Sequence, residues 1–362
     1  MGPRRLAPRH GRALRTLGRE AEAREELSQT LDEVAHDVAA SPDPAAYLSQ
    51  ARGLIAEVAL SATTADALAL PPDRLRAAAL HVAPAQAGWS RALPEGVCVL
   101  VRVPGDKFTL QAVARREGGG VQRLGEERAA PGAQAGAGFS AGTDPTGTDR
   151  CDELWTFAGP PLDAVDLPQA TGIATSLTRL LAPEPRSPPR SALFVTAETR
   201  GEVAAVAGAL PGAEREQAAL SKLAATTALS GERATPEEAL RLAPDFALLH
   251  FAVHGFEGRA LQLAGEGGRL AARDIAQAHL KAGARVVLSS CAAGTPGPGG
   301  VAWAFARAGA LAIAAARGEV DDAAAARWSE RFYAALGAGQ PFARAAREAG
   351  QEDRAARFIV VK

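Results

Sequence analysis

Two apolar segments in the C-terminal part of the chain constrain its fold most. They are DFALLHFAVHG at residues 245–255 and ARVVLSSCAAG at residues 284–294. Each is a short run of Phe, Leu, Val and Ala that stops at small residues. Runs of this length, bounded by Gly and separated by helical patterns, are typical of strands buried on both faces of a parallel sheet.

A base and a nucleophile follow these two predicted strands. The first segment ends at His254 and Gly255, and the second reaches Cys291 shortly before Gly294. In open parallel sheets, ligands bind outside the carboxyl ends of the strands. We therefore expect His254 and Cys291 to lie at a site. His250 precedes His254 at even spacing, so it shares the same face of the strand, and we expect it in the core or behind the site.

The same alternation of strand and helix runs from residue 188 to the C-terminus. The predicted strands are SALFVTA, TTALSG, the two segments above, ALAIAAA and FIVVK, and helical patterns separate them. One helix begins after Thr235 with capping-box spacing and with Pro236 at its first position. This order predicts an α/β fold with a doubly wound, mostly parallel six-stranded sheet.

Two further regions precede this domain. Residues 1–84 predict an N-terminal helical segment, either a helix that packs on the rest of the chain or a tetratricopeptide-repeat remnant, because LGREAEAREELSQTL resembles part of such a repeat. Stacked repeats need about three units to be stable, so an independent array is not expected. Residues 85–187 predict a smaller β-containing region with a flexible loop at 130–149, which is rich in Gly, Ala, Thr and Pro. The third domain is then 188–362.

Charge and cysteine usage limit the classes of function. A net charge of −1 over 362 residues gives no reason to expect nucleic acid or an anionic membrane as a partner. No apolar stretch approaches the roughly 18 residues of a membrane span, and no secretory signal is evident. Cys98, Cys151 and Cys291 form no CxxC pair, which argues against a disulfide framework and a zinc site. We therefore expect a reduced, cytoplasmic protein without metal or cofactor, with Cys98 and Cys151 as packing residues.

The motifs from about residue 210 onward resemble those of the CHAT family. The matching segments, in that family's order and spacing, are LPGAEREQAAL, SGERATPEEAL, LLHFAVHG, VVLSSCAAG, AWAFARAGA and EVDDAAAARWSERFYAAL. CHAT proteins are caspase-like cysteine peptidases of the separase and caspase superfamily, often joined to tetratricopeptide repeats. The resemblance covers roughly residues 85–362. It implies a caspase-like fold, in which residues 85–187 support the sheet or mimic half of a caspase dimer.

The resemblance implies that His254 and Cys291 form a catalytic dyad. A thiol with a pKa of about 8.5 is only a few per cent thiolate at neutral pH, so a neighbouring imidazole increases the supply of nucleophile. The same imidazole can later protonate the leaving amine. The resemblance assigns the oxyanion hole to the backbone N–H groups of Gly255 and Cys291, and losing one such donor typically costs about 100- to 1000-fold in rate. The structural alternative is an inert buried cysteine and a histidine at a turn.

An acidic pair, Asp321 and Asp322, follows the predicted strand ALAIAAA. Asp favours helix N-termini, so capping of the next helix would explain one of the two residues. In the superfamily, an acidic residue at this point lines the substrate pocket and selects Arg or Lys, because a carboxylate pairs bidentately with a guanidinium group. The resemblance favours Asp322 in this role, with Glu319 as its competitor and Ser290 lining the cleft.

The sequence therefore predicts a cytoplasmic cysteine endopeptidase that cleaves a protein substrate after a basic residue, with Arg preferred. One alternative is a catalytically silent interaction or regulatory module on the same fold, since fold does not fix function. The other is a different acyl-transfer hydrolase that uses the same dyad on an amide or thioester. An activating protein partner or ligand is compatible with this interpretation.

Overall fold

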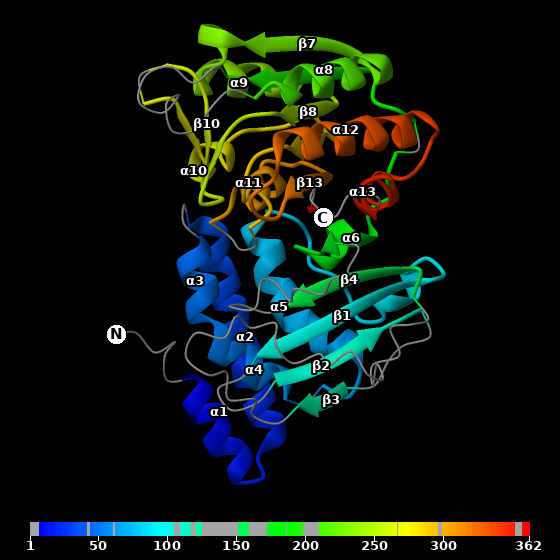
Figure 1. Cartoon of the computed structure of the whole chain (residues 1–362). Coiled ribbons are helices and arrows are strands. Elements are labelled where there is room, and N and C mark those ends of the chain that lie inside the picture. The colour runs from blue at the N-terminus through cyan, green and yellow to red at the C-terminus, as the bar shows by residue number, and fades with distance from the viewer. Residues whose placement is uncertain are drawn as a thin grey trace. The chain divides into compact units, whose positions relative to one another are not determined.

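The chain folds into two compact units, Met1–Leu181 and Ala182–Lys362 (Figure 1). The structure is a computed structural model, and it describes residues 7–41, 44–60, 62–104, 109–116, 121–124, 151–158, 172–185, 187–197, 210–265, 267–295, 299–351 and 357–362. The loop predicted at 130–149 lies outside these residues. The predicted division at residues 84 and 187 stays a prediction.

A six-stranded sheet forms the centre of the second unit, with the strand order β14-β13-β12-β8-β6-β7. Neighbouring strands from β13 to β7 pair in parallel, and β14 is antiparallel to β13. The strands are β6 Ser191–Thr196, β7 Ala225–Ser230, β8 Leu248–Phe251, β12 Arg285–Leu288, β13 Ala312–Ala316 and β14 Phe358–Val361. The predicted mostly parallel sheet of six strands is confirmed.

Burial explains why the central strands read as continuous apolar runs. Every residue of β8, β12 and β13 is buried, as expected for strands covered on both faces. Strand β7 lies at the edge of the sheet, and most of its residues are exposed or half-buried. The edge strand accordingly carries the polar sequence ATTALS.

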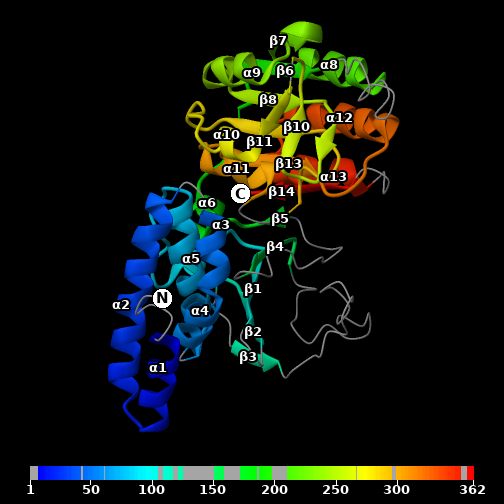
Figure 2. The same ribbon diagram turned by 90° about the vertical axis from the view of Figure 1, so that its left-hand side faces the viewer.

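Helices cover both faces of this sheet, which is therefore doubly wound as predicted (Figure 2). One side carries α8 Gly212–Leu223, α12 Asp322–Gly337 and α13 Phe342–Gln351, and the other carries α9 Pro236–Leu242, α10 Ala272–Ile275 and α11 Val301–Arg307. Two short 3-10 helices flank α9, namely η4 Gly231–Arg233 and η5 Ala243–Asp245.

Local signals set the ends of some of these helices correctly and missed others. Helix α9 begins as predicted, since the Thr235 side chain accepts a hydrogen bond from the Glu238 N–H at 3.3 Å and Pro236 follows directly. The helix expected over residues 272–283 stops at Ile275, because the chain turns to pair the Leu280 N–H with the carbonyl of Ala308. Helix α13 was not predicted.

A small antiparallel sheet comes directly after the predicted catalytic histidine. Its strands are β9 Gly255–Phe256, β10 Ala260–Gln262 and β11 Arg269–Ala271, in the order β11-β10-β9. The chain therefore leaves the main sheet at the end of β8 and turns at once into a tight hairpin.

The first unit combines helices with a sheet in the order β3-β2-β1-β4-β5. Strand β1 pairs in parallel with β4 and antiparallel with β2. The strands are β1 Val97–Pro104, β2 Thr109–Ala114, β3 Val121–Leu124, β4 Glu153–Ala158 and β5 Gly172–Ile173. The helices are α1 Ala7–Thr16, α2 Glu20–Ala40, α3 Pro44–Gln50, α4 Arg52–Ala59, α5 Ala65–Ala79, the 3-10 helix η2 Trp89–Ala92 and α6 Leu177–Leu181.

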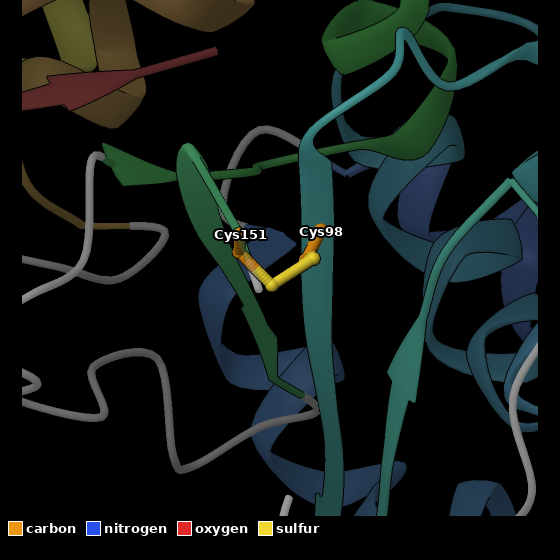
Figure 3. The surroundings of a disulfide bond; sticks show 2 residues. All are labelled: Cys98 and Cys151. Atoms are coloured by element: carbon orange, nitrogen blue, oxygen red, sulfur yellow. A yellow bond between two sulfur atoms is a disulfide. The ribbon is translucent and has the colours of Figure 1, made fainter. Parts of the chain in front are cut away.

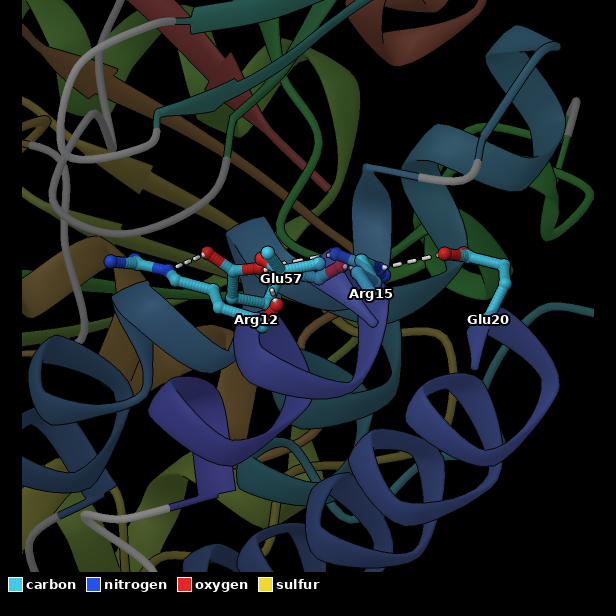
Figure 4. A network of polar contacts seen from close by, with 5 residues as sticks. Arg12, Arg15, Glu20 and Glu57 are labelled. Carbon is cyan, nitrogen blue, oxygen red and sulfur yellow. Dashed lines mark hydrogen bonds and ion pairs between the residues drawn. The ribbon is translucent and has the colours of Figure 1, made fainter. Parts of the chain in front are cut away.

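A buried carboxylate ties the first helix to the fourth (Figure 4). Glu57 on α4 is 3% exposed, and its Oε2 lies 3.1 Å from Arg15 Nη1 of α1. Arg12 contacts the other carboxylate oxygen, and Arg15 Nη2 also donates to the Glu57 carbonyl at 2.7 Å. These contacts therefore hold α1 against α4, and the origin of the N-terminal helices as a repeat remnant stays a prediction.

Cys98 and Cys151 form a disulfide, so the expectation that they are reduced is wrong, whereas their expected packing is confirmed by a hydrophobic cluster with Leu100 and Leu154 (Figure 3). Cys98 lies on β1, and Cys151 comes two residues before β4. Because β1 and β4 are paired neighbours, the two Cα atoms come within 5.7 Å although the cysteines are 53 residues apart in sequence. The spacing of the two cysteines in the sequence gave no indication that they would pair. Disulfides are rare in reducing compartments, and the predicted cytoplasmic location stays a prediction.

Candidate active site

The two strands that carry the predicted dyad are parallel neighbours in register. Phe251, the last residue of β8, faces Leu288, the last residue of β12. His254 and Cys291 each follow three residues after this facing pair. The carboxyl ends of neighbouring parallel strands meet at one edge of the sheet, so the sequence placed both residues at the correct edge.

Gly255 brings the histidine segment into direct contact with the cysteine segment. A Cβ built on Gly255 would lie 2.2 Å from the carbonyl oxygen of Cys291, a distance that no real side chain tolerates. Only glycine allows the two backbones to approach this closely. The N–H of Gln262 donates to the His254 carbonyl at 2.8 Å, which makes Leu261 and Gly255 a non-hydrogen-bonded pair of the small sheet. The N–H of Gly255 is therefore not used by β10.

The turn that carries Cys291 is fixed to the chain at the end of β13. The N–H of Ala292 donates to the carbonyl of Gly318 at 2.8 Å, and that of Gly294 donates to the carbonyl of Ala316 at 2.7 Å. Ala292 has a φ of 56°, in the left-handed region that non-glycine residues seldom adopt. Such strained residues cluster at functional sites, where surrounding contacts hold them.

Exposure separates Cys291 from the serine that precedes it. His254, Gly255 and Cys291 are all half-buried, and Cys291 is a free cysteine. Ser290, expected to line the cleft, is 1% exposed, and its hydroxyl lies 3.5 Å from the carbonyl of Phe251. A substrate could touch the Ser290 side chain only if the turn moved.

The two aspartates at the start of α12 have different contacts. Asp321 is exposed and caps the helix, because its Oδ1 accepts the N–H of Ala324 at 2.9 Å. Asp322 is half-buried, and its Oδ2 accepts the N–H of Gly212 at 2.5 Å. Burial raises the pKa of Asp322 above its ordinary value, although the Gly212 N–H and the nearby charge of His254 act in the opposite direction.

Sequence reasoning missed a buried polar network behind the site. Glu216 of α8 is 2% exposed, and its carboxylate accepts hydrogen bonds from the hydroxyls of Ser289 at 3.1 Å and Ser329 at 2.5 Å. His250 Nε2 lies 3.1 Å from Glu216 Oε2, within ion-pair distance but without hydrogen-bond geometry. His250 Nδ1 contacts the hydroxyl of Tyr333. The expectation that His250 lies in the core or behind the site agrees with its complete burial.

One sequence signal could have identified Glu216. It falls between Ala213 and Leu220 at three- and four-residue spacing, and all three residues are buried on one face of α8. An acidic residue within an apolar helical face is unusual, because burying a charge is costly unless it is paired. The residues that contact Glu216 could not be predicted from the helical spacing of α8, because they lie on other elements.

The described residues give no indication of a metal or a membrane span. Among them, no group of three or more His, Cys, Asp or Glu side chains is arranged to hold a metal ion. Within the same residues, no helix combines the length and the apolar content that crossing a membrane requires. The predicted absence of cofactors stays a prediction.

Solved structures that are similar to this chain include a gingipain and a separase. Gingipain R (RgpB) of Porphyromonas gingivalis, an Arg-specific cysteine proteinase, is 12% identical over 58% of this chain and 54% of its own, with a TM-score of 0.39. Separase of Saccharomyces cerevisiae, in complex with securin, is 9% identical over 95% of this chain and 38% of its own, with a TM-score of 0.49. This chain thus spans about half of the gingipain chain and little more than a third of separase. No curated protein matches it in sequence.

The second unit is an α/β fold in which a histidine and a cysteine follow neighbouring parallel strands. The CHAT domain model matches residues 167–355, which is more than half of the chain. The protein therefore belongs to the CHAT family, as the sequence motifs predicted.

Proposed function

We propose that this protein is a cysteine endopeptidase whose dyad is His254 and Cys291, and that it cleaves protein substrates after a basic residue. One observation carries the proposal. The His254–Gly255 segment and Cys291 follow adjacent parallel strands at matching positions, and Gly255 packs directly on the Cys291 backbone. A half-buried free cysteine and a half-buried histidine at one edge of the sheet are the residue types that acyl transfer by a cysteine requires.

The chemistry follows from these positions. His254 takes the thiol proton, and the Cys291 thiolate attacks the carbonyl carbon of the scissile peptide bond. The oxyanion that forms is stabilised by the backbone N–H groups of Gly255 and Cys291, and the first of these is not used by β10. His254 then protonates the leaving amine, and water hydrolyses the acyl-enzyme while His254 accepts its proton.

The substrate preference depends on the charge of Asp322. This carboxylate is half-buried and near enough to His254 for their charges to interact. A carboxylate beside a cleft attracts a cationic side chain and repels an acidic one. We propose Arg before the scissile bond, with Lys second, because the Lys ammonium group cannot form the bidentate pair. Asp321 has the weaker claim, since it is exposed and caps α12.

The deciding experiment compares the wild-type protein with Cys291→Ala and His254→Ala, using peptide libraries and sequencing of the cut sites. We expect both variants to fold, to bind substrate and to lose cleavage by at least about a thousandfold. The double variant Cys98→Ser/Cys151→Ser is the cysteine control, because it removes both disulfide sulfur atoms from the first unit, creates no new free thiol and leaves the dyad intact. If purified Cys291→Ala cleaves at the wild-type rate, with contaminating protease excluded, the assignment of this protein as a cysteine peptidase is wrong.

A further inference from the structure

A single buried carboxylate joins the two chain segments that carry the dyad. Glu216 Oε1 accepts a hydrogen bond from Ser289 Oγ at 3.1 Å, two residues before Cys291. Glu216 Oε2 lies 3.1 Å from His250 Nε2, four residues before His254. One oxygen thus contacts the cysteine segment and the other contacts the histidine segment.

The same network is anchored to α12. Ser329 Oγ donates to Glu216 Oε2 at 2.5 Å, and the Tyr333 hydroxyl contacts His250 Nδ1. Burial raises the pKa of Tyr333 well above its ordinary value, and the charge of Glu216 acts in the same direction. Two hydroxyl donors and one imidazole therefore surround the carboxylate, and these residues are less than a tenth exposed.

Ser289 stands where strand β12 changes into the turn that holds the nucleophile. Its N–H still donates to the Phe251 carbonyl at 2.9 Å, as a continuation of the sheet. One residue beyond Cys291, Ala292 adopts the left-handed conformation with a φ of 56°. The Ser289 side chain is thus a fixed point beside a strained turn. Misplacing reacting groups by about 1 Å can cost about 100-fold in rate.

We propose that Glu216 is a positioning residue for the dyad. It holds the Ser289–Cys291 segment at a fixed distance from the His250–His254 segment, and it acts through the side chains of Ser289 and His250. This inference rests on the proposed peptidase function and adds the group that sets the geometry of its active site.

The structure offers a matched pair of variants to test this role. Ser289→Ala and Ser329→Ala each remove one hydroxyl hydrogen bond to the Glu216 carboxylate, and both serines are buried. Only Ser289 belongs to a dyad segment, because Ser329 lies on α12. A merely structural role for the network predicts the same effect on activity from both variants. A positioning role predicts different effects.

We expect Ser289→Ala to lower kcat on an Arg peptide about tenfold with little change in KM, because it disturbs placement rather than binding. Ser329→Ala should lower the Tm by a similar amount and keep kcat within about threefold of wild type. Glu216→Gln should lower kcat at least as much as Ser289→Ala does; if that variant does not fold, Ser289→Ala carries the test. Equal kcat for the two serine variants, or no loss in Ser289→Ala, would overturn the proposal.

A second readout does not depend on peptidase activity. Cys291 is the free cysteine of the native protein, so iodoacetamide reports on it directly. Across pH 5 to 10, Ser289→Ala should slow Cys291 alkylation about threefold or shift its pH profile, whereas Ser329→Ala should change it less, because Ser329 has no backbone link to the cysteine segment. If the wild-type protein cleaves no peptide but the alkylation rates differ in this way, the peptidase assignment fails while the role of Glu216 stands. Identical alkylation profiles for both variants and wild type refute that role.

Discussion

Gly255 lies so close to Cys291 that a Cβ at residue 255 would be 2.2 Å from the Cys291 carbonyl oxygen and 3.3 Å from its backbone nitrogen. The atoms in the way belong to the backbone, so no side-chain rotation can relieve the clash. The small hairpin that follows His254 is therefore seated on the turn that holds the nucleophile. Both the packing of the hairpin and the placement of His254 beside the Cys291 turn therefore require a residue without a Cβ at position 255.

Gly255→Ala should consequently displace either the His254 segment or the Cys291 turn. We expect kcat/KM to fall about 100-fold, because a shift of about 1 Å in reacting groups has that effect. Stability should fall by about 1–3 kcal/mol, as for other overpacked sites. Gly299→Ala is the control, since a Cβ there would meet nothing within 4 Å. Peptide kinetics and thermal unfolding of the two variants measure both effects, and wild-type activity in Gly255→Ala would contradict this account.

Asp322→Asn separates the charge of this residue from its contact with α8. An Asn oxygen can still accept the N–H of Gly212, which Asp322 accepts at 2.5 Å. We expect kcat/KM for an Arg peptide to fall about 10- to 100-fold, with a Leu peptide nearly unchanged, because the charge-assisted pair is lost. Asp321→Asn keeps its cap on α12 and should change neither. Fluorogenic peptides ending in Arg, Lys, Asp and Leu measure the ratios, and a native preference for Asp or Leu rules out an acidic pocket that selects Arg.

Acidification should weaken the same preference. Burial raises the pKa of Asp322, so this carboxylate is protonated at a higher pH than an ordinary Asp. Protonation removes the negative charge that attracts Arg, and the ratio of Arg to Leu cleavage should therefore fall as the pH drops through the raised pKa. Protonation of the dyad lowers the cleavage of both peptides by the same factor, so it does not change the ratio of Arg to Leu cleavage. A ratio that stays constant down to the ordinary Asp range would argue against Asp322 as the selecting group.

The disulfide changes the expected thiol chemistry. The chain has three cysteines, and two of them are bonded, so unfolded but unreduced protein should contain one reactive thiol and reduced protein three. Cys98→Ser should lower the free energy of unfolding by up to about 4 kcal/mol, because the crosslink restricts the unfolded chain. Cys291→Ser should show no comparable loss. Thiol titration and thermal unfolding with and without reductant check this, and three thiols without reductant would exclude the disulfide.

The Glu57 contacts predict a large loss of stability in the first unit. Glu57 is 3% exposed and pairs with Arg12 and Arg15 across two helices. Glu57→Ala should cost about 3 kcal/mol, since it removes the buried acceptor that Arg12 and Arg15 share and leaves the partly buried Arg15 with the more exposed Glu20. Arg19→Ala breaks an exposed pair with Glu22 and should cost less than about 1 kcal/mol. Chemical denaturation compares the two, and equal losses would show that the burial of Glu57 is not decisive.

The local pattern of residues determined much of this protein. Mostly apolar runs predicted the buried strands β8, β12 and β13, because a strand covered on both faces is largely apolar, and His250 of β8 and Arg285 of β12 are the polar exceptions. The regular alternation with helices then placed His254 and Cys291 at one edge of the sheet. Thr235 and Pro236 marked the start of α9 in the same local way.

Only the tertiary structure decided which distant residues meet. Glu216 accepts hydrogen bonds from Ser289 and Ser329, which are separated from it by 73 and 113 positions in the sequence. The disulfide joins two cysteines that are 53 positions apart. The direction of β14 and the two different contacts of Asp321 and Asp322 were likewise set by neighbouring elements. Periodicity reports whether a side chain is buried, because burial follows from the geometry of one strand or helix. The partner of a buried polar group depends on how several elements pack together, and no local pattern contains that information.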